Sequence, residues 1–230
     1  MERLTGLSGV RSALAPLAAV FAPGAVFRRE AVHPRPLASA AGVLGLTIAS
    51  AWSLAPFVRA AARAAGLNPA AGPVRTAIAI KLGVLTPADT VLFLLLVAGV
   101  LWTVSVISGG IDTDFATCLV IASVASVTEA LRRGFALLVL WLRASRLGGA
   151  QGGYDVSTGL DLFFEPFRSG PPVLVSLSRH LGLFEVWLVI LLGIGLVEMR
   201  RMPVRLAALT ASLAYGLVLL LLVGVDLLAT

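Results

Sequence analysis

The sequence predicts an all-α, polytopic membrane protein with five transmembrane helices and short interfacial helices. Of its 230 residues, 58% are hydrophobic and only 13% are charged, and the mean hydropathy is +0.97. A soluble globular domain has a much less apolar composition. The apolar residues fall in uncharged runs of about 20 residues, which is the length of a helix that crosses a bilayer. Because lipid offers the backbone no hydrogen-bond partners, such runs must be helical.

Residues 1–36 are expected to form a cytoplasmic N-terminal segment that is partly amphipathic. Apolar residues recur there at three- and four-residue steps, which predicts a helix lying in the membrane interface. These residues are Leu4, Leu7, Val10, Leu14, Leu17 and Phe21. Pro16 weakens the helix, so a loosely ordered tail is an equal alternative. The segment lacks the pattern of a signal peptide, and we expect it to be retained.

A single transmembrane domain is predicted over residues 37–228, and its first span is residues 37–58. This run has no charged residue, and at 1.5 Å per residue it is about 33 Å long. Small residues at three- and four-residue steps predict a face for close helix packing and self-association; they are Ala38, Gly42, Gly45 and Ala49. Residues 74–85 are predicted to form a weak interfacial helix and not a span.

The second and third spans are predicted at residues 90–111 and 115–143. The third span contains a cluster of charged residues, Glu129, Arg132 and Arg133. One interpretation of this cluster is a polar lock or an ion path between helices, because ionisable groups inside a membrane are usually functional. The other is a helix that leaves the bilayer. The length of the run, about 43 Å, favours the second interpretation.

The remaining chain is predicted to contain a long loop and two further spans. Residues 146–180 are rich in glycine and proline and are predicted to be a loop, which at this length would be unusual unless functional. The fourth and fifth spans follow at residues 181–198 and 206–226. Glu185 falls in the first turn of the fourth span, where a carboxylate complements the helix dipole. His180 and Glu185 are therefore interpreted as a loop-to-helix boundary.

We expect the protein to be non-enzymatic, with no cofactor and no metal site. The sequence contains neither a His-Glu-x-x-His motif nor a Gly-x-x-x-x-Gly-Lys loop. His180 has no second histidine near it in the sequence and cannot meet the usual acid–base requirement alone. The single cysteine, Cys118, excludes an intrachain disulfide. The arginines are scattered without interleaved aromatic residues, so nucleic-acid binding is not expected, and membrane lipids are the expected partners.

The distribution of arginine predicts the orientation of the chain. Five arginines precede the first span, and three more, Arg200, Arg201 and Arg205, lie between the fourth and fifth spans. With five spans these two segments lie on the same side, so the positive-inside rule favours a cytoplasmic N-terminus. Lys81 is the only lysine among 18 basic residues. This usage is typical of a GC-rich prokaryote and indicates its inner or plasma membrane.

Several short motifs resemble those of prokaryotic Yip1-domain proteins. The stretch "FAPGAVFRREAVHPRPL" has a Phe-x-Pro and a second aromatic residue before the first span. The stretches "GLDLFF" and "LGLFEVWLVILLGIGL" resemble the later part of that family. The residues that carry the resemblance are Phe21, Pro23, Phe27, Leu160, Asp161, Phe184, Trp187, Gly193 and Gly195.

The resemblance implies a five-span protein with a cytoplasmic N-terminus and no known catalytic residues. Its role would be membrane-organising, as a trafficking component or scaffold that acts through helix packing and binding to a second copy or another membrane protein. Eukaryotic members are associated with Rab GTPases, for which the short N-terminal segment leaves little room. The alternative is a transporter or channel for a small solute, ion or lipid that uses Glu129, Arg132 and Arg133. A water-filled cavity reaching these charges would favour the alternative.

Overall fold

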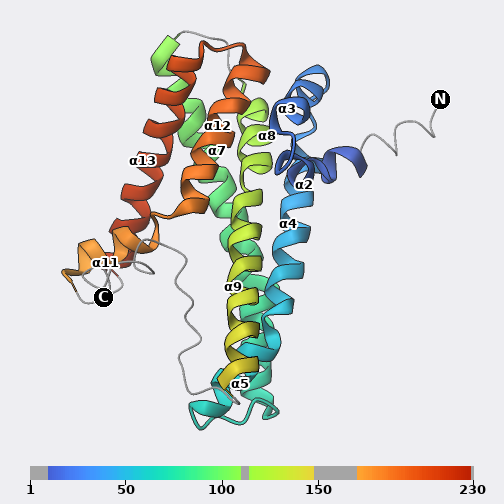
Figure 1. Cartoon of the computed structure of the whole chain (residues 1–230), viewed down its shortest axis with the longest axis vertical. Coiled ribbons are helices and arrows are strands. Elements are labelled where there is room, and N and C mark those ends of the chain that lie inside the picture. The colour runs from blue at the N-terminus through green and yellow to red at the C-terminus, as the bar shows by residue number, and fades with distance from the viewer. Residues whose placement is uncertain (1–9, 110–113, 148–169, 229–230) are drawn as a thin grey trace.

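A computed structural model describes residues 10–109, 114–147 and 170–228, and all regular structure in these ranges is helical (Figure 1). Four helices are long and apolar enough to cross a membrane, and a fifth span results if one bent helix pair is counted as a unit. The predicted all-α, polytopic membrane fold is therefore confirmed.

The N-terminal segment folds back on itself beside the bundle. Helices α2 (Ala15–Ala19) and α3 (Pro23–Val32) are joined by a short turn and pack against each other. Glu30 is 2% exposed; its carboxylate accepts a hydrogen bond from Ser12 Oγ at 3.1 Å and pairs with Arg29 Nη2 at 3.1 Å. The apolar residues in this part of the predicted stripe are exposed, as a lipid-facing surface requires; they are Val10, Leu14, Leu17 and Phe21. Leu4 and Leu7 lie outside the described residues.

The first span is α4 (Pro36–Ser53), which continues through a break at Leu54 into α5 (Ala55–Ala64). The helical stretch is therefore longer than predicted. The small residues that were predicted to form one packing face lie in different surroundings, some against the N-terminal segment and some on the outer surface. A Cβ at Gly42 would collide with the backbone carbonyl of Ala13, whereas a Cβ at Gly45 would meet nothing within 4 Å. Ala38 is half-buried and Ala49 is exposed. Gly42 therefore serves packing within the chain.

The Gly42→Ala substitution is expected to loosen the N-terminal segment from α4. The added methyl group meets backbone rather than a flexible side chain, so residues 10–32 must shift, at about 1–2 kcal/mol. We expect amide hydrogen exchange in residues 10–32 to speed up roughly tenfold. Gly45→Ala is the matched control and should leave exchange unchanged. Equal exchange in the two variants would contradict the close contact between Gly42 and Ala13.

The second span begins much earlier than predicted. Helix α6 (Gly72–Ile80), the π-helical turn η1 (Lys81–Leu85) and α7 (Thr86–Gly109) form one continuous helical rod. The helix predicted at residues 74–85 is therefore continuous with the second span. Pro87 cannot donate a backbone hydrogen bond, and its ring crowds the carbonyl one turn earlier. The wider π turn just before it accommodates the proline without ending the helix.

The third span lies at the centre of the bundle and consists of two helices. Helices α8 (Phe115–Ala125) and α9 (Val127–Leu147) meet at Ser126, whereas a single helix over residues 115–143 was predicted. The Ser126 hydroxyl donates to the carbonyl oxygen of Ala122 at 2.7 Å, an arrangement that bends helices. Every residue from 117 to 128 except Leu119 is buried, so this part of the span is the core against which the other helices pack.

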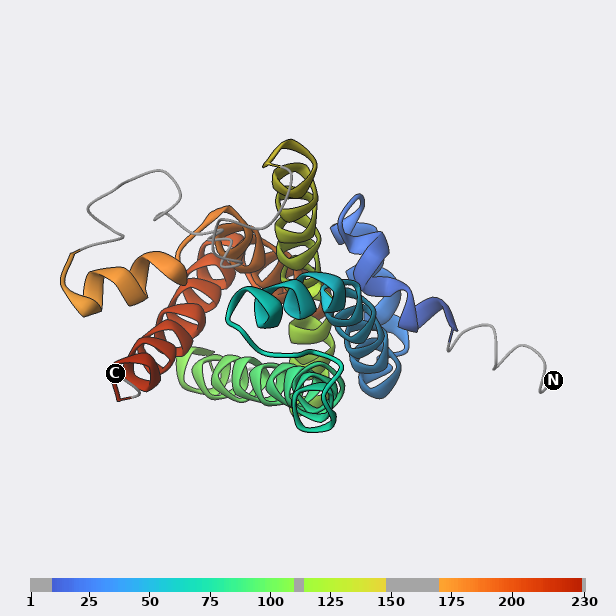
Figure 2. The same cartoon turned by 90° about the horizontal axis from the view of Figure 1, so that it is seen from below.

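The predicted loop at residues 146–180 is partly helical. Helix α9 continues to Leu147, and α11 (Pro172–Arg179) precedes α12 (Leu183–Arg200) at a bend of 60°. Two adjacent prolines explain this error, because a proline in the first turn starts a helix as readily as it ends one. Figure 2 shows α11, in orange, projecting from the side of the bundle. Leu160 and Asp161 lie outside the described residues.

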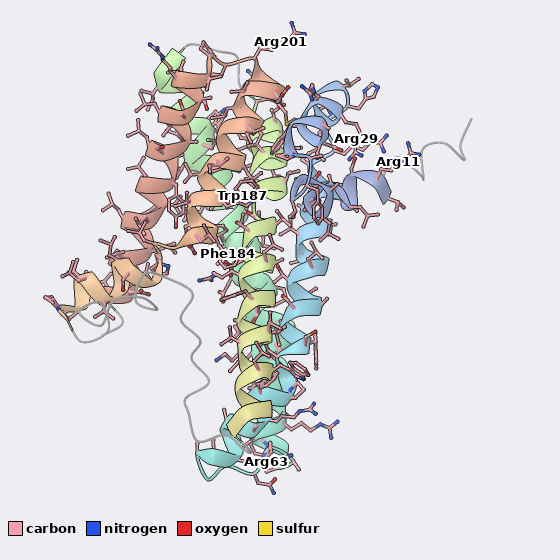
Figure 3. The ribbon with its side chains drawn as sticks, viewed as in Figure 1. Arg11, Arg29, Arg63, Phe184, Trp187 and Arg201 are labelled. Atoms are coloured by element: carbon pink, nitrogen blue, oxygen red, sulfur yellow. The ribbon has the colours of Figure 1, made fainter. Side chains whose placement is uncertain are left out.

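The fifth span is α13 (Val204–Leu228), and the spans are staggered along the long axis of the molecule. Helices α12 and α13 occupy one half, α4 and α9 reach the opposite end, and α7 runs through both halves (Figure 1). Arg11, Arg29 and Arg201 lie toward one end and Arg63 lies at the other (Figure 3). The two arginine-rich segments thus share a side of the bundle, and an ion pair of 3.3 Å between Arg28 and Glu198 links them.

Candidate functional site: a charged cavity between four spans

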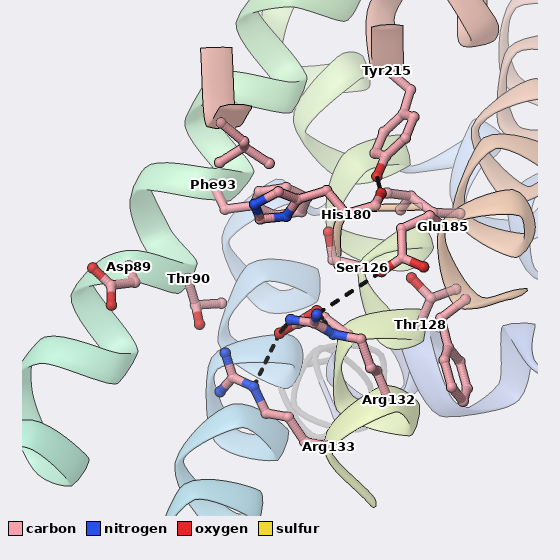
Figure 4. Close-up of a pocket in the computed structure, with 14 residues that line it drawn as sticks. Asp89, Thr90, Phe93, Ser126, Thr128, Arg132, Arg133, His180, Glu185 and Tyr215 are labelled. Carbon is pink, nitrogen blue, oxygen red and sulfur yellow. Dashed lines mark hydrogen bonds and ion pairs between the residues drawn. The ribbon is translucent and has the colours of Figure 1, made fainter. Parts of the chain in front are cut away.

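A cavity of about 270 Å³ lies between α7, α9, α12 and α13 (Figure 4). Phe184, one of its lining residues, lies about midway along the molecule between Arg201 and Arg63 (Figure 3). The cavity brings together two groups that are far apart in the sequence, the predicted charged cluster of α9 and the His180–Glu185 pair. The polar residues that line it are Asp89, Thr90, Ser126, Thr128, Glu129, Arg132, Arg133, His180, Glu185 and Tyr215.

Four of these residues form a chain of alternating charge. Arg132 binds Glu129 with two hydrogen bonds, of 2.9 Å from Nε and 2.8 Å from Nη2. Arg133 Nε donates to the same carboxylate at 3.1 Å. On the other side, Arg132 Nη1 lies 4.0 Å from Glu185 Oε1. The order along the chain is Glu185, Arg132, Glu129, Arg133, and its formal charge is zero.

Helix geometry explains the α9 part of this chain. Positions three and four residues after Glu129 lie on the same face of a helix, so both guanidinium groups reach its carboxylate. Glu185 comes from the first turn of α12, as predicted. Its carboxylate also faces the cavity, which the helix-cap interpretation did not anticipate. The rings of Phe135 and Phe184, 6.0 Å apart between centroids, pack α9 against the start of α12.

Two of the three helix breaks described above occur at this cavity, whereas the break at Leu54 does not. Ser126, where α8 meets α9, and His180, between α11 and α12, are lining residues. An interrupted helix within a membrane protein is tolerated where it is buried in protein or lines a water-filled cavity. In transporters, such discontinuous helices form the substrate site. The coincidence of two breaks with the charged chain therefore indicates a site and not only a structural ion pair.

The charged cluster lies about midway along its candidate span, which bears on both interpretations of the cluster but does not give its depth in a membrane. The candidate span runs from Phe115 to Leu142, so 14 residues precede Glu129 (115–128) and 13 follow it (130–142). The side chains of Glu129, Arg132 and Arg133 are 24%, 31% and 20% exposed. The cluster is thus held between helices near the middle of the span.

Two charged side chains in the cavity wall keep an atom without a hydrogen-bond partner among the described residues. These atoms are Arg133 Nη1 and Glu185 Oε2, and both are buried. An unsatisfied buried polar atom costs about 1–3 kcal/mol, and more if it is charged. They belong to the two ends of the charged chain. Water does not reach either atom, so both are covered by protein and do not face the open space of the cavity.

His180 is held in place by two side-chain contacts that sequence reasoning missed. Its Nε2 lies 3.1 Å from Asp226 Oδ2, which also accepts a 2.6 Å hydrogen bond from Ser176 Oγ. The Tyr215 hydroxyl donates to the carbonyl oxygen of His180 at 2.8 Å. These contacts fix the bend before α12 against α13. Tyr215 and Asp226, two polar residues within the predicted fifth span, were the signals that could have drawn attention to α13.

The residues that resemble the Yip1-domain motifs do not gather at one place. Phe27 is fully buried, and a Cβ built on Gly195 would come within 3.1 Å of its ring and 2.7 Å of Ile121. Phe184 lines the cavity, whereas Phe21 is 89% exposed. Pro23 begins α3, Trp187 is half-buried on α12, and Gly193 makes only an ordinary contact with Ala211. Most of these residues therefore serve helix packing.

Fold and site together define a helical, multi-pass membrane protein with a charged cavity inside the bundle. Comparisons of the chain with family models, curated proteins and solved structures find no match. The resemblance to Yip1-domain proteins stays a prediction. Among the described residues, no three His, Cys, Asp or Glu side chains gather closely enough to hold a metal ion.

Proposed function

We propose that this protein binds a small charged solute or lipid headgroup in the cavity and moves it across the membrane. The observation that carries the proposal is the charged chain of α9 and α12, which lines a partly open cavity between four spans. A scaffold needs only packed helices. Burial of charged side chains carries a desolvation cost, and such residues within membrane spans are usually functional. The helix breaks at Ser126 and His180 support the proposal, because they provide places where the spans can bend around a bound solute.

We expect the Glu129→Gln substitution to lower solute flux at least about tenfold. The neutral amide no longer holds both guanidinium groups, so the charged chain loses its centre. The measurement is osmotic swelling of proteoliposomes in glycine, choline chloride and sodium gluconate. The wild-type protein should admit at least one of these solutes. Glu198→Gln, the same change at the Arg28 ion pair outside the cavity, should keep the wild-type rate.

A solute flux that is unchanged by Glu129→Gln would contradict the assigned pathway. If no solute enters with the wild-type protein, movement across the membrane is excluded for these probes, and the second candidate function gains support. That candidate is the membrane-organising role implied by the Yip1-domain resemblance. The observation in its favour is the packing of Phe27 against Gly195, because two of the motif residues meet at the joint between α3 and α12.

For this second candidate, we propose a second copy of the chain or another membrane protein as the partner. The outward-facing Gly45 and Ala49 of α4 offer a small-residue surface for such a contact. For both candidates, we propose a cytoplasmic N-terminus in a prokaryotic inner or plasma membrane. The shared end of Arg11, Arg29 and Arg201 supports this orientation.

A further inference from the structure

We propose that the cavity binds the headgroup of a membrane phospholipid, and that one acyl chain of the same lipid lies in an apolar groove beside the cavity. This inference rests on the proposed binding function of the cavity and adds the chemical class of its ligand. The groove is a second hollow, of about 300 Å³, on the seam where α7 and α13 pack together. It is lined by residues of α7 between Leu95 and Val104 and by Leu217 of α13.

The groove begins where the cavity ends. On α7, Phe93 lines the cavity, and Leu96, three residues later, lines the groove. On α13, Leu222 lines the cavity and Leu217 lines the groove, and five residues of helix are about 7.5 Å long. Both helices therefore place the groove next to the cavity, on the side toward the C-terminal end of α7.

One face of α7 carries residues of both hollows. Positions at three- and four-residue steps lie on the same face of a helix. The residues that follow each other at these steps are Asp89, Phe93, Leu96, Val100 and Thr103. The first two line the cavity and the last three line the groove. The face is 14 residues long (103 minus 89), or about 21 Å. An acyl chain occupies about half of the roughly 30 Å hydrocarbon thickness, so this face is long enough for a headgroup and one chain.

The two hollows differ in chemistry as the two ends of a phospholipid do. Thr103 has the one polar side chain among the residues that line the groove, and its hydroxyl donates to the carbonyl oxygen of Gly99 at 2.8 Å. The groove therefore offers methylene groups an apolar wall. The cavity contains Arg132 and Arg133, whose side chains are 31% and 20% exposed. Guanidinium groups bind phosphate through charge-assisted hydrogen bonds.

Gly99 keeps the groove open. A Cβ built on this residue would meet nothing within 4 Å, so its missing side chain leaves space that no neighbour fills. Leu95 and Leu217, on the two walls, are each 46% exposed. The groove therefore opens on the outer surface of the bundle, where an acyl chain can enter from the surrounding lipid.

The test counts the phospholipid that the purified protein retains, by native mass spectrometry, after release from nanodiscs with equal amounts of phosphatidylethanolamine and phosphatidylglycerol. We expect the wild-type protein to retain one of the two lipids. Gly99→Leu fills the groove from α7 and Leu217→Trp fills it from α13, and each should lower retention at least about tenfold. Leucine favours a helix over glycine, so Gly99→Leu should fold.

Gly45→Leu is the matched control for the groove. A Cβ at Gly45 also meets nothing within 4 Å, and the residue lies on α4, outside both hollows. This variant should retain the wild-type amount of lipid.

A second arm tests the headgroup in the cavity. Arg133→Gln removes a guanidinium group from the cavity wall and should lower retention at least about tenfold. Glu198→Gln, at the ion pair outside the cavity, should not change it. Glycerophosphoethanolamine and glycerophosphoglycerol have the same headgroups without acyl chains. They should not displace the lipid even at about a hundredfold excess, because the groove contributes nothing to their binding.

The proposal is overturned if the wild-type protein retains neither lipid, or if Gly99→Leu or Leu217→Trp retains as much lipid as Gly45→Leu. Retention that survives Arg133→Gln would also overturn it, by placing the lipid in the groove alone. Displacement by the headgroup compounds would overturn it by identifying a free solute as the ligand. These outcomes are separate from those of the flux experiment. Lipid retention without solute flux would keep the ligand class and remove solute transport, and solute flux without lipid retention would do the reverse.

Discussion

Arg132→Gln is expected to lower the free energy of unfolding by about 2–3 kcal/mol. Arg132 is the only member of the charged chain that contacts two carboxylates, those of Glu129 and Glu185. Its loss leaves the Glu129 carboxylate with Arg133 as its partner and removes the ion pair of Glu185. Removal of one partner from a fully buried ion pair costs about 3–5 kcal/mol. The expected loss here is smaller because the side chain is 31% exposed.

The measurement is reversible unfolding of the purified protein in mixed micelles, followed by tryptophan fluorescence. Arg28→Gln is the control, because it removes an ion pair whose arginine side chain is 67% exposed, and such pairs contribute about 0–1 kcal/mol. A variant Arg132→Gln that is as stable as Arg28→Gln would show that the chain of charges does not hold α9 and α12 together.

Gly195→Ala is expected to destabilise the protein by about 1–3 kcal/mol, although alanine usually favours a helix over glycine. The added Cβ would lie 2.7 Å from Cγ2 of Ile121 and 3.1 Å from the ring of Phe27. Both side chains are fully buried, and a β-branched residue in a helix cannot easily rotate away. The helices α3, α8 and α12 must therefore move apart.

Gly193→Ala, two residues earlier on the same helix, is the control for this effect. Its Cβ would lie 4.0 Å from Ala211, an ordinary contact, so the substitution should be neutral or stabilising by about 1 kcal/mol. The same unfolding measurement compares the two variants. If both substitutions shift stability equally, the close packing at Gly195 does not exist.

Much of the architecture could be predicted from hydropathy alone, because an uncharged run of bilayer length has no alternative to a helix. The failures come from residues whose effect depends on their surroundings. The second span was predicted to begin at residue 90, yet the π turn before Pro87 lets the helical rod extend back to Gly72. Ser126 bends the third span by bonding to its own backbone, which no periodicity reveals. Helix α11 was not predicted because it lies in a segment rich in glycine and proline.

The candidate site could be predicted only in part, for a related reason. Local spacing predicts that Glu129 pairs with residues on its own helix, and the structure places Arg132 and Arg133 on its carboxylate. The contact from Arg132 to Glu185 joins residues 53 positions apart (185 minus 132), and single-sequence periodicity contains no information on such a pair. Tertiary packing therefore brings Glu185, at the start of α12, and the charged cluster of α9 together in the wall of one cavity.

The central claim is that water and solute reach a charged cavity inside the bundle, and cysteine accessibility tests it most directly. In a Cys118→Ser background, Leu222→Cys places a thiol on the cavity wall, whereas Leu220→Cys places one on the outer surface of α13, where Leu220 is 69% exposed. In proteoliposomes, a membrane-impermeant cationic methanethiosulfonate should modify Leu222→Cys and leave Leu220→Cys, which faces lipid, unmodified. Equal labelling of both thiols, or labelling of Leu220→Cys alone, would contradict the account.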